Sequence, residues 1–207
     1  NNGQDDLIWH EGSISGNTAT FYVNRNDHKG EYGTYYTHIY AYDASGNNTC
    51  NSDTSVNVKQ SAVNLGNDFY ANISFGGKNL SITDRNVFIS DKDGSTAQIW
   101  HFIRQSDGTY KIVNMKNGEE KCLDVYDAVG TSGANVQVYP DNGSTAQRWY
   151  VYSQNGKYIL KALCAPNCAL DIKNASTANG ANAQSWSYHG RPAQQFEINK
   201  TLTPANI

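Results

Sequence analysis

Gln98-Ile99-Trp100, Gln147-Arg148-Trp149 and Gln194-Gln195-Phe196 are three copies of one short motif. The motif glutamines are spaced 49 and 47 residues apart, which is a nearly constant period. Such a period is typical of a fold built from repeated units that bury their apolar faces only together. The copies also supply an internal alignment, which separates the positions that every repeat keeps from those that only some repeats keep.

A second shared segment precedes the motif in the last two copies. Counted from an Asp inside an apolar triplet, a Gln follows at +13, an aromatic residue at +15, Asn or His at +18 and the motif Gln at +23. The offsets are identical in both copies, which chance rarely produces. The second copy carries Asp124, Gln137, Tyr139, Asn142 and Gln147, and the third carries Asp171, Gln184, Trp186, His189 and Gln194.

The first copy keeps the apolar framework and loses the polar set. Ser81 replaces the Asp, Phe88 replaces the Gln and Ser90 replaces the aromatic residue, whereas Gln98 and Trp100 remain. A purely structural set would not be lost in this way. The contrast between the copies is therefore our main argument that the set has a function.

The composition argues against several classes of protein. The 207 residues have a net charge of −3 and no basic run, so the cationic footprint of nucleic-acid binding is missing. No apolar run approaches the ~20 residues of a membrane span. No leader segment is recognisable, so we expect a mature or excised piece. Short alternating runs bounded by Gly, Asn and Asp predict β-strands joined by tight turns, and hence an all-β fold.

The cysteines and histidines predict no metal site and no cofactor. Cys164 and Cys168 lie in a Pro-containing loop that either closes as a disulfide or leaves both thiols free. Cys122 follows the pattern of a small buried hydrophobe in a strand. No His/Cys set has zinc spacing. Asp91 begins a run that resembles a calcium loop, but its twelfth position is Phe102 rather than Glu, so we interpret the run as a turn.

No catalytic constellation is visible, and we predict that the chain is not an enzyme. The five histidines are scattered, with no nucleophile elbow near them. Asp124 and Asp171 occupy equivalent places in different repeats, which separates them by more than the ~5–10 Å of a glycosidase pair.

Residues 1–60 lack the repeat, and we expect four strands there. These strands are Leu7-Ile8-Trp9, Thr18 to Asn24, Thr34 to Tyr42 and Ser55 to Lys59. Within the third strand, alternation places Tyr36, His38, Tyr40 and Tyr42 on one face. Residues 43–47 (Asp-Ala-Ser-Gly-Asn) are expected to form the turn that follows.

This N-terminal segment resembles a known module. The run Asn-Gly-Gln-Asp-Asp-Leu-Ile-Trp at 2–9, with Asp27-His28 and Gly33-Thr34-Tyr35, is similar to the GBS Bsp-like repeat. That repeat is an immunoglobulin-like module of secreted bacterial cell-surface and cell-wall proteins. The resemblance implies a small immunoglobulin-like β-sandwich over residues 1–60 whose first strands are missing.

The rest of the chain resembles a lectin family. We expect a linker at 61–68, three repeats at about 69–114, 115–162 and 163–199, and a tail at 200–207. Three repeats of four short strands suit a β-trefoil. Leu-Asp-Val together with Gln-x-Trp resembles the signature of ricin B-type lectins, also called carbohydrate-binding module family thirteen. The resemblance implies binding of sugars without a metal, commonly galactose, N-acetylgalactosamine or xylan-type chains.

The residue types of the polar set suit a sugar. A pyranose carries hydroxyls on its rim and a C–H patch on its face, so Tyr139 or Trp186 would form a flat platform. Asp124 or Asp171 would accept hydrogen bonds from two hydroxyls, each contributing about 1.5–3 kcal/mol. The rim is expected to be completed by Gln137 or Gln184 and by Asn142 or His189. The motif residues Gln147 and Gln194 would brace the Asp or its loop.

Structural alternatives exist for each of these roles. Both aspartates also suit turns in which a carboxylate accepts from its own backbone, both platform aromatics suit ordinary strands, and His189 suits a plain loop. We therefore consider two hypotheses. In the first, the chain is a non-catalytic, glycan-binding fragment that holds a larger secreted or cell-surface protein, with a linked catalytic domain, on a glycan. In the second, it is a structural or protein-interaction spacer.

Overall fold

The computed structural model describes residues 8–23, 33–116 and 120–201, and the chain divides into two compact units, Asn1–Ser61 and Ala62–Ile207. The described residues form β-strands joined by turns and single-turn 3-10 helices. This confirms the all-β prediction. Within the described ranges, no helix is long and apolar enough to cross a membrane.

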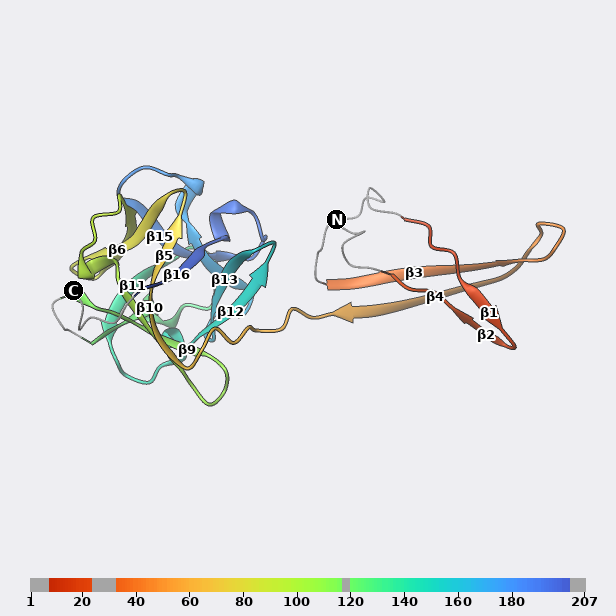
Figure 1. Cartoon of the computed structure of the whole chain (residues 1–207), viewed down its shortest axis with the longest axis horizontal. Coiled ribbons are helices and arrows are strands. Elements are labelled where there is room, and N and C mark those ends of the chain that lie inside the picture. Colours follow the sequence, from red (N-terminus) through yellow and green to blue (C-terminus); the bar gives the residue numbers. More distant parts are fainter. Residues whose placement is uncertain (1–7, 24–32, 117–119, 202–207) are drawn as a thin grey trace. The chain divides into compact units, whose positions relative to one another are not determined.

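The described residues of the first unit form two antiparallel hairpins (Figure 1). Strand β1 (Ser13–Ser15) pairs with β2 (Thr18–Thr20), and β3 (Gly33–Tyr42) pairs with β4 (Asn48–Val58). The turn after β3 forms as expected, because the Asp43 Oδ1 accepts the backbone N–H groups of Ser45 and Asn47, both at 2.9 Å.

The alternation expected along β3 is confirmed. Tyr36, His38 and Tyr40 are exposed, while Tyr35 and Ile39 on the other face are half-buried.

Three of the four strands expected in this unit differ from the structure. The fourth strand, expected at Ser55 to Lys59, begins earlier, as β4 (Asn48–Val58). Ile8 and Trp9 lie outside any strand, and Leu7 lies outside the described residues. The second expected strand is present only at Thr18–Thr20, since residues 21–23 are irregular and Asn24 is not described. A two-residue turn at Gly16-Asn17 joins β1 and β2, which pair over three residues each.

In the part of the second unit that the structure describes, twelve strands join in one sheet that closes around a common core (Figure 1). In chain order they form three sets of four, which begin at residues 68, 110 and 157 rather than at the repeat starts of about 69, 115 and 163 expected from the sequence. The first set is β5 (Asp68–Phe75), β6 (Lys78–Thr83), β7 (Asn86–Ser90) and β8 (Trp100–Arg104). The second is β9 (Tyr110–Asn114), β10 (Lys121–Val125), β11 (Ala134–Pro140) and β12 (Trp149–Gln154). The third is β13 (Lys157–Ala162), β14 (Cys168–Ile172), β15 (Ala181–Ser187) and β16 (Glu197–Thr201).

The motif aromatics lie in the core, as predicted. Trp100, Trp149 and Phe196 are fully buried. The indole N–H of Trp100 donates to the Leu80 carbonyl at 3.1 Å, and that of Trp149 donates to the Leu123 carbonyl at 2.8 Å. Each bond satisfies a buried indole N–H and ties the motif to the strand that carries the polar position of its own repeat. Phe196 has no N–H and contributes packing alone.

The expected linker at 61–68 is largely part of the second unit. Val63 donates its N–H to the Val151 carbonyl at 2.8 Å. The Tyr110 hydroxyl accepts the Leu65 N–H at 2.8 Å and donates to the Gly66 carbonyl at 2.9 Å. A buried tyrosine thus anchors the chain where it enters the trefoil.

Three asparagines at the repeat spacing form a closed ring. The Asn86 amide donates to Asn182 at 2.9 Å, Asn182 donates to Asn135 at 2.9 Å, and Asn135 donates to Asn86 at 3.1 Å. Each repeat contributes one member, so the ring lies on the approximate threefold axis that relates the repeats.

Candidate functional site: two carboxylate–amide pairs in equivalent repeats

The two aspartates lie on strands, which rules out the turn interpretation. Asp124 on β10 pairs with Gln137 on β11, and Asp171 on β14 pairs with Gln184 on β15. Alternation along each strand sends the flanking Leu and Val or Ile into the core and turns the Asp to the outer face of the sheet. The residue directly opposite on an antiparallel neighbour shares that face, which is why each Gln meets its Asp.

Each pair is joined by a hydrogen bond. The Gln137 amide donates to the Asp124 Oδ1 at 3.0 Å, and the Gln184 amide donates to the Asp171 Oδ1 at 2.9 Å. Burial raises the pKa of both carboxyls, and the amide donors act in the opposite direction. The result is an oriented carboxylate with little exposed surface, held as an acceptor for a hydroxyl.

The motif glutamine has the same bracing role in all three repeats. Each ends a short 3-10 turn: η2 (Thr96–Gln98), η5 (Thr145–Gln147) and η7 (Pro192–Gln194). Its Oε1 accepts the N–H of the residue five positions earlier, at 3.3 Å for Gln98 and 3.0 Å for Gln147 and Gln194. Its amide donates to the carbonyl seven positions earlier, at 2.7 to 3.1 Å. The expected bracing of the loop is confirmed.

The residue 18 positions after each aspartate, Asn142 or His189, uses its side chain in a turn of its own loop. The Asn142 Oδ1 accepts the Ser144 N–H at 2.9 Å, and the His189 Nδ1 accepts the Arg191 N–H at 3.1 Å. In the first repeat, the Asp93 Oδ1 accepts the Ser95 N–H at 2.8 Å in the same way. The acceptor atom of the side chain is therefore used by its own loop.

His189 still faces the carboxylate of its repeat. Because Nδ1 accepts from Arg191, the ring proton lies on Nε2. Nε2 is 3.6 Å from the Asp171 Oδ2, which is longer than a hydrogen bond but close enough for electrostatic attraction. The third repeat thus has a donor beside its aspartate at a position where the second repeat has Asn142.

The two aromatic platforms differ in exposure. Trp186 is 42% exposed, and its ring edge lies near Gly133 of the preceding repeat. Tyr139 is half-buried, and the Arg85 guanidinium lies over its ring, 5.4 Å from the centroid. Arg85 precedes the ring residue Asn86, and its repeat equivalent beside Trp186 is Ala134. The second-repeat platform therefore has a cationic cover that the third lacks.

Arg85 and Gly133 were not predicted as site residues. Each belongs to the repeat before the site that it flanks, and internal alignment compares positions within a repeat. The only available signal was the repeat spacing of Asn86 and Asn135, which shows that the residues before them are also equivalent.

The first repeat lacks this arrangement. Ser81 pairs with Phe88, so neither a carboxylate nor an amide is present at these two positions. The Gln98 amide donates to the Ser90 hydroxyl at 2.9 Å, and its Oε1 accepts from Asn79 at 3.0 Å. The side chain of Gln98 is therefore hydrogen-bonded to side chains of its own repeat as well as to the backbone.

The loop after each aspartate contains backbone strain. The turn η4 (Tyr126–Ala128) has φ values of +53° at Asp127 and +51° at Ala128. The turn η6 (Lys173–Ala175) has φ values of +60° and +51° at the last two residues. Two successive non-Gly residues in the left-handed region are costly, and such strain clusters at binding sites. These turns carry Tyr126 and Lys173 outward beside the carboxylates.

The structure also bears on the predictions made for the cysteines and for metal binding. Cys164 and Cys168 are free thiols, so the disulfide alternative is not adopted, and Cys122 is fully buried as expected. In the ranges that the structure describes, no cluster of three or more His, Cys, Asp or Glu side chains could hold a metal ion.

Comparison with known proteins agrees with this geometry. Residues 40–139, 96–186 and 145–205 match the family described as "Ricin-type beta-trefoil lectin domain-like". The chain belongs to this ricin-type family. Residues 1–56 match the GBS Bsp-like repeat. Both resemblances read from the sequence are confirmed.

Individual relatives of this ricin-type chain support the same fold. It is 36% identical over 74 residues to the main hemagglutinin components type C and type D of Clostridium botulinum C and D phages, a match that covers 34% of this chain and only 26% of each relative. The designed threefold-symmetric protein ThreeFoil is 34% identical, with a TM-score of 0.59, over 63% of this chain and 97% of that protein. The Macrolepiota procera ricin B-like lectin, solved in complex with lactose, has a TM-score of 0.58 at 14% identity, over 67% and 100% of the two chains.

Proposed function

We propose that the second unit is a non-catalytic carbohydrate-binding domain with sites in its second and third repeats. One observation carries the proposal. The same carboxylate–amide pair, at 3.0 and 2.9 Å, stands beside an aromatic residue in two repeats and is replaced by Ser81 and Phe88 in the first. Membership of a lectin-type family and the likeness to hemagglutinin components support sugar as the ligand.

Each site would hold one sugar face against its aromatic residue and fix the hydroxyls with its Asp and Gln. Galactose and N-acetylgalactosamine are the ligands we propose, supported by the lactose complex of the Macrolepiota procera lectin, which shares the fold. A shallow single site has an expected dissociation constant near the millimolar scale, about −4 kcal/mol. Two sites on one rigid domain gain apparent affinity on a polymer or a glycan-dense surface.

We propose further that the chain serves a secreted or bacterial cell-surface protein and holds it, with any linked catalytic domain, on a glycan. The GBS Bsp-like match at residues 1–56 supports this setting. The competing function is a spacer without sugar binding, and the binding stoichiometry separates the two.

The test is a glycan-array screen followed by calorimetry with the sugar that the array identifies. Four chains are compared: the parent, Asp124→Ala, Asp171→Ala and the double variant. We expect two sites per chain in the parent, one in each single variant and none in the double variant. Ser81→Ala is the matched control, because Ser81 occupies the equivalent strand position in the first repeat, and it should leave two sites.

Two results would contradict the proposal. If Asp171→Ala retained both sites, the Asp171 carboxylate would not be part of a sugar site. A folded parent chain that binds no glycan on the array would favour the spacer function.

A further inference from the structure

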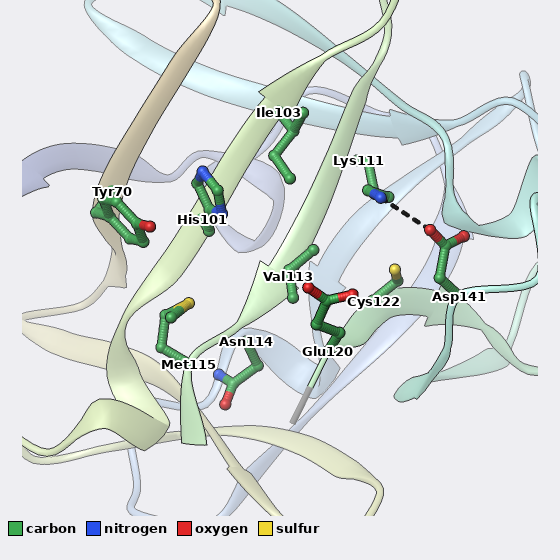
Figure 2. Close-up of a pocket in the computed structure, with 10 residues that line it drawn as sticks. All are labelled: Tyr70, His101, Ile103, Lys111, Val113, Asn114, Met115, Glu120, Cys122 and Asp141. Atoms are coloured by element: carbon green, nitrogen blue, oxygen red, sulfur yellow. Dashed lines mark hydrogen bonds and ion pairs between the residues drawn. The ribbon is translucent and has the colours of Figure 1, made fainter. Parts of the chain in front are cut away.

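A pocket of about 260 Å³ lies on the outer face of the sheet beside the second-repeat site (Figure 2). Its floor is apolar and comes from Ile103 on β8, Val113 on β9 and Cys122 on β10. Burial raises the pKa of the Cys122 thiol to about 12, so this floor is uncharged at neutral pH.

Strand register makes the pocket continuous with the site. His101 is opposite Val113, Val113 is opposite Cys122, and Cys122 is opposite Tyr139. Directly opposed residues share one face of a sheet, so these four side chains form a row on the outer face. Cys122 also precedes Asp124 by two residues on the same strand, which places both on that face. The row therefore runs from the far wall of the pocket to the platform of the site.

The walls of the pocket have the chemistry of a sugar site. On one side, the Tyr70 and His101 rings stack with centroids 4.3 Å apart, and the Asp68 Oδ1 fixes the His101 Nε2 at 2.5 Å. On the other side, the Lys111 Nζ donates to the Asp141 Oδ2 at 2.8 Å. Figure 2 shows these two pairs facing each other across the floor. An aromatic wall, an apolar floor and prepositioned polar groups together suit a hydroxylated ring.

The third repeat has closed the equivalent space. Lys161 pairs opposite Tyr150, in the same way as Val113 pairs opposite His101. Lys161 therefore takes the position in the third repeat that Val113 has in the second. Lys161 lies 3.6 Å from the ring centroid of Tyr188, the repeat equivalent of Asp141. Burial lowers the pKa of Lys161, which agrees with a side chain packed into this space. The small Val113 and the short Asp141 leave the space open beside the second-repeat site.

We propose that this pocket is a second sugar subsite, so that the second-repeat site binds two linked sugar units and the third-repeat site binds one. The inference rests on the proposed function, because it needs Asp124 to hold the first unit. It adds that the second sugar ring of a neutral glycan binds between the Tyr70–His101 stack and the Lys111–Asp141 pair.

The single methionine of the chain, Met115, lines the pocket and supplies a specific probe. In the Asp171→Ala background, the methyl signal of labelled Met115 is followed by NMR during titration with methyl β-galactoside or with β-1,3- or β-1,4-galactobiose. We expect at least one galactobiose to bind tenfold or more tightly than the monosaccharide and to shift the Met115 signal, which the monosaccharide leaves in place.

Val113→Lys copies the third repeat and should reduce galactobiose binding to the affinity of the monosaccharide. Tyr70→Ala, in the aromatic wall, should have the same effect and serves if Val113→Lys does not fold. The subsite is wrong if both sugars bind equally and Met115 stays unmoved. Absence of binding by both sugars overturns the galactose-type function itself, and the subsite with it, so the two failures are distinct.

Discussion

At Asp124, burial and hydrogen bonding act on the pKa of the carboxyl in opposite directions. Burial raises its pKa, while the amides of Gln137 and Gln147 favour the ionised form. Only the ionised carboxylate accepts from two sugar hydroxyls, so ligand affinity should follow its titration.

We expect sugar affinity at the second-repeat site to fall on acidification, with a midpoint above the ordinary value for Asp of about 3.9. The folded state favours the protonated form relative to the unfolded state. Between the ordinary and the raised pKa, the folded chain therefore binds more protons, and the free energy of unfolding decreases as pH rises through that window. Calorimetric titration of Asp171→Ala from pH 7 to pH 3 measures the midpoint at the second-repeat site alone, because the third-repeat site is removed in this variant. A midpoint at or below 3.9 would contradict the raised pKa.

Gln147→Ala separates bracing from binding. The change removes the acceptor for the Asn142 N–H and the donor to the Pro140 carbonyl. We expect a loss of about 1–3 kcal/mol in the free energy of unfolding, because both backbone groups lose their partners. We also expect weaker sugar binding at the second-repeat site. Urea denaturation and calorimetry measure the two effects.

The matched control is Gln98→Ala, which removes the same brace from the first repeat. It should cost similar stability and leave both sugar sites in place. If Gln98→Ala weakened sugar binding as much as Gln147→Ala, the effect would be general destabilisation rather than a local one.

At the scale of elements, the strained turns η4 and η6 are a shared feature of the two complete repeats. We expect Ala128→Gly to raise the free energy of unfolding by about 0.5–1 kcal/mol. A left-handed Ala costs roughly 1–2 kcal/mol, and the added entropy of Gly in the unfolded chain offsets part of the gain. Urea denaturation measures the change.

Ala178→Gly is the control for Ala128→Gly, because Ala178 is exposed and lies outside the residues with positive φ. It should lower stability through unfolded-chain entropy alone. Equal effects of the two substitutions would show that Ala128 is not strained.

Element by element, the sequence predicted the second unit better than the first. Repetition made Asp124 comparable with Asp171 and with Ser81, and that comparison predicted the three repeats, the bracing glutamine and the two polar sets. Residues 1–60 offer no such comparison, and the strand expected at Leu7-Ile8-Trp9 was wrong at Ile8 and Trp9. The apolar triplet fitted the local pattern of a strand. Among the described residues of that unit, however, no strand pairs with Ile8 or Trp9.

Across the whole molecule, the asparagine ring joins all three repeats. Each member donates once and accepts once, so any single Asn→Ala change breaks two of the three bonds. We expect Asn135→Ala to lower the free energy of unfolding by about 1–3 kcal/mol. The triple variant should cost clearly less than three times that amount, because one substitution already removes most of the ring. Urea denaturation of both variants decides this, and strict additivity would mean that the bonds are independent.

Contacts between repeats were the part that the sequence did not reveal. Two features depend on how the sheet closes, because closure brings together strands from different repeats. One is the position of Arg85 over Tyr139, and the other is the row of side chains from His101 to Tyr139. Lys161 is the third-repeat equivalent of Val113, and the sequence analysis did not single it out. Only the pairing register shows that its side chain fills the space that is open beside the second-repeat site.

The ring of asparagines also bears on how such a chain can arise. Donation runs in one direction, from Asn86 to Asn182 to Asn135 and back to Asn86, with one member from each repeat. Three identical short peptides could close that circuit by rotational symmetry, whereas two could not. An ancestral gene that encoded one repeat would therefore have had a route to this architecture as a homotrimer. Tandem duplication would then have freed each copy to keep, change or lose its own site.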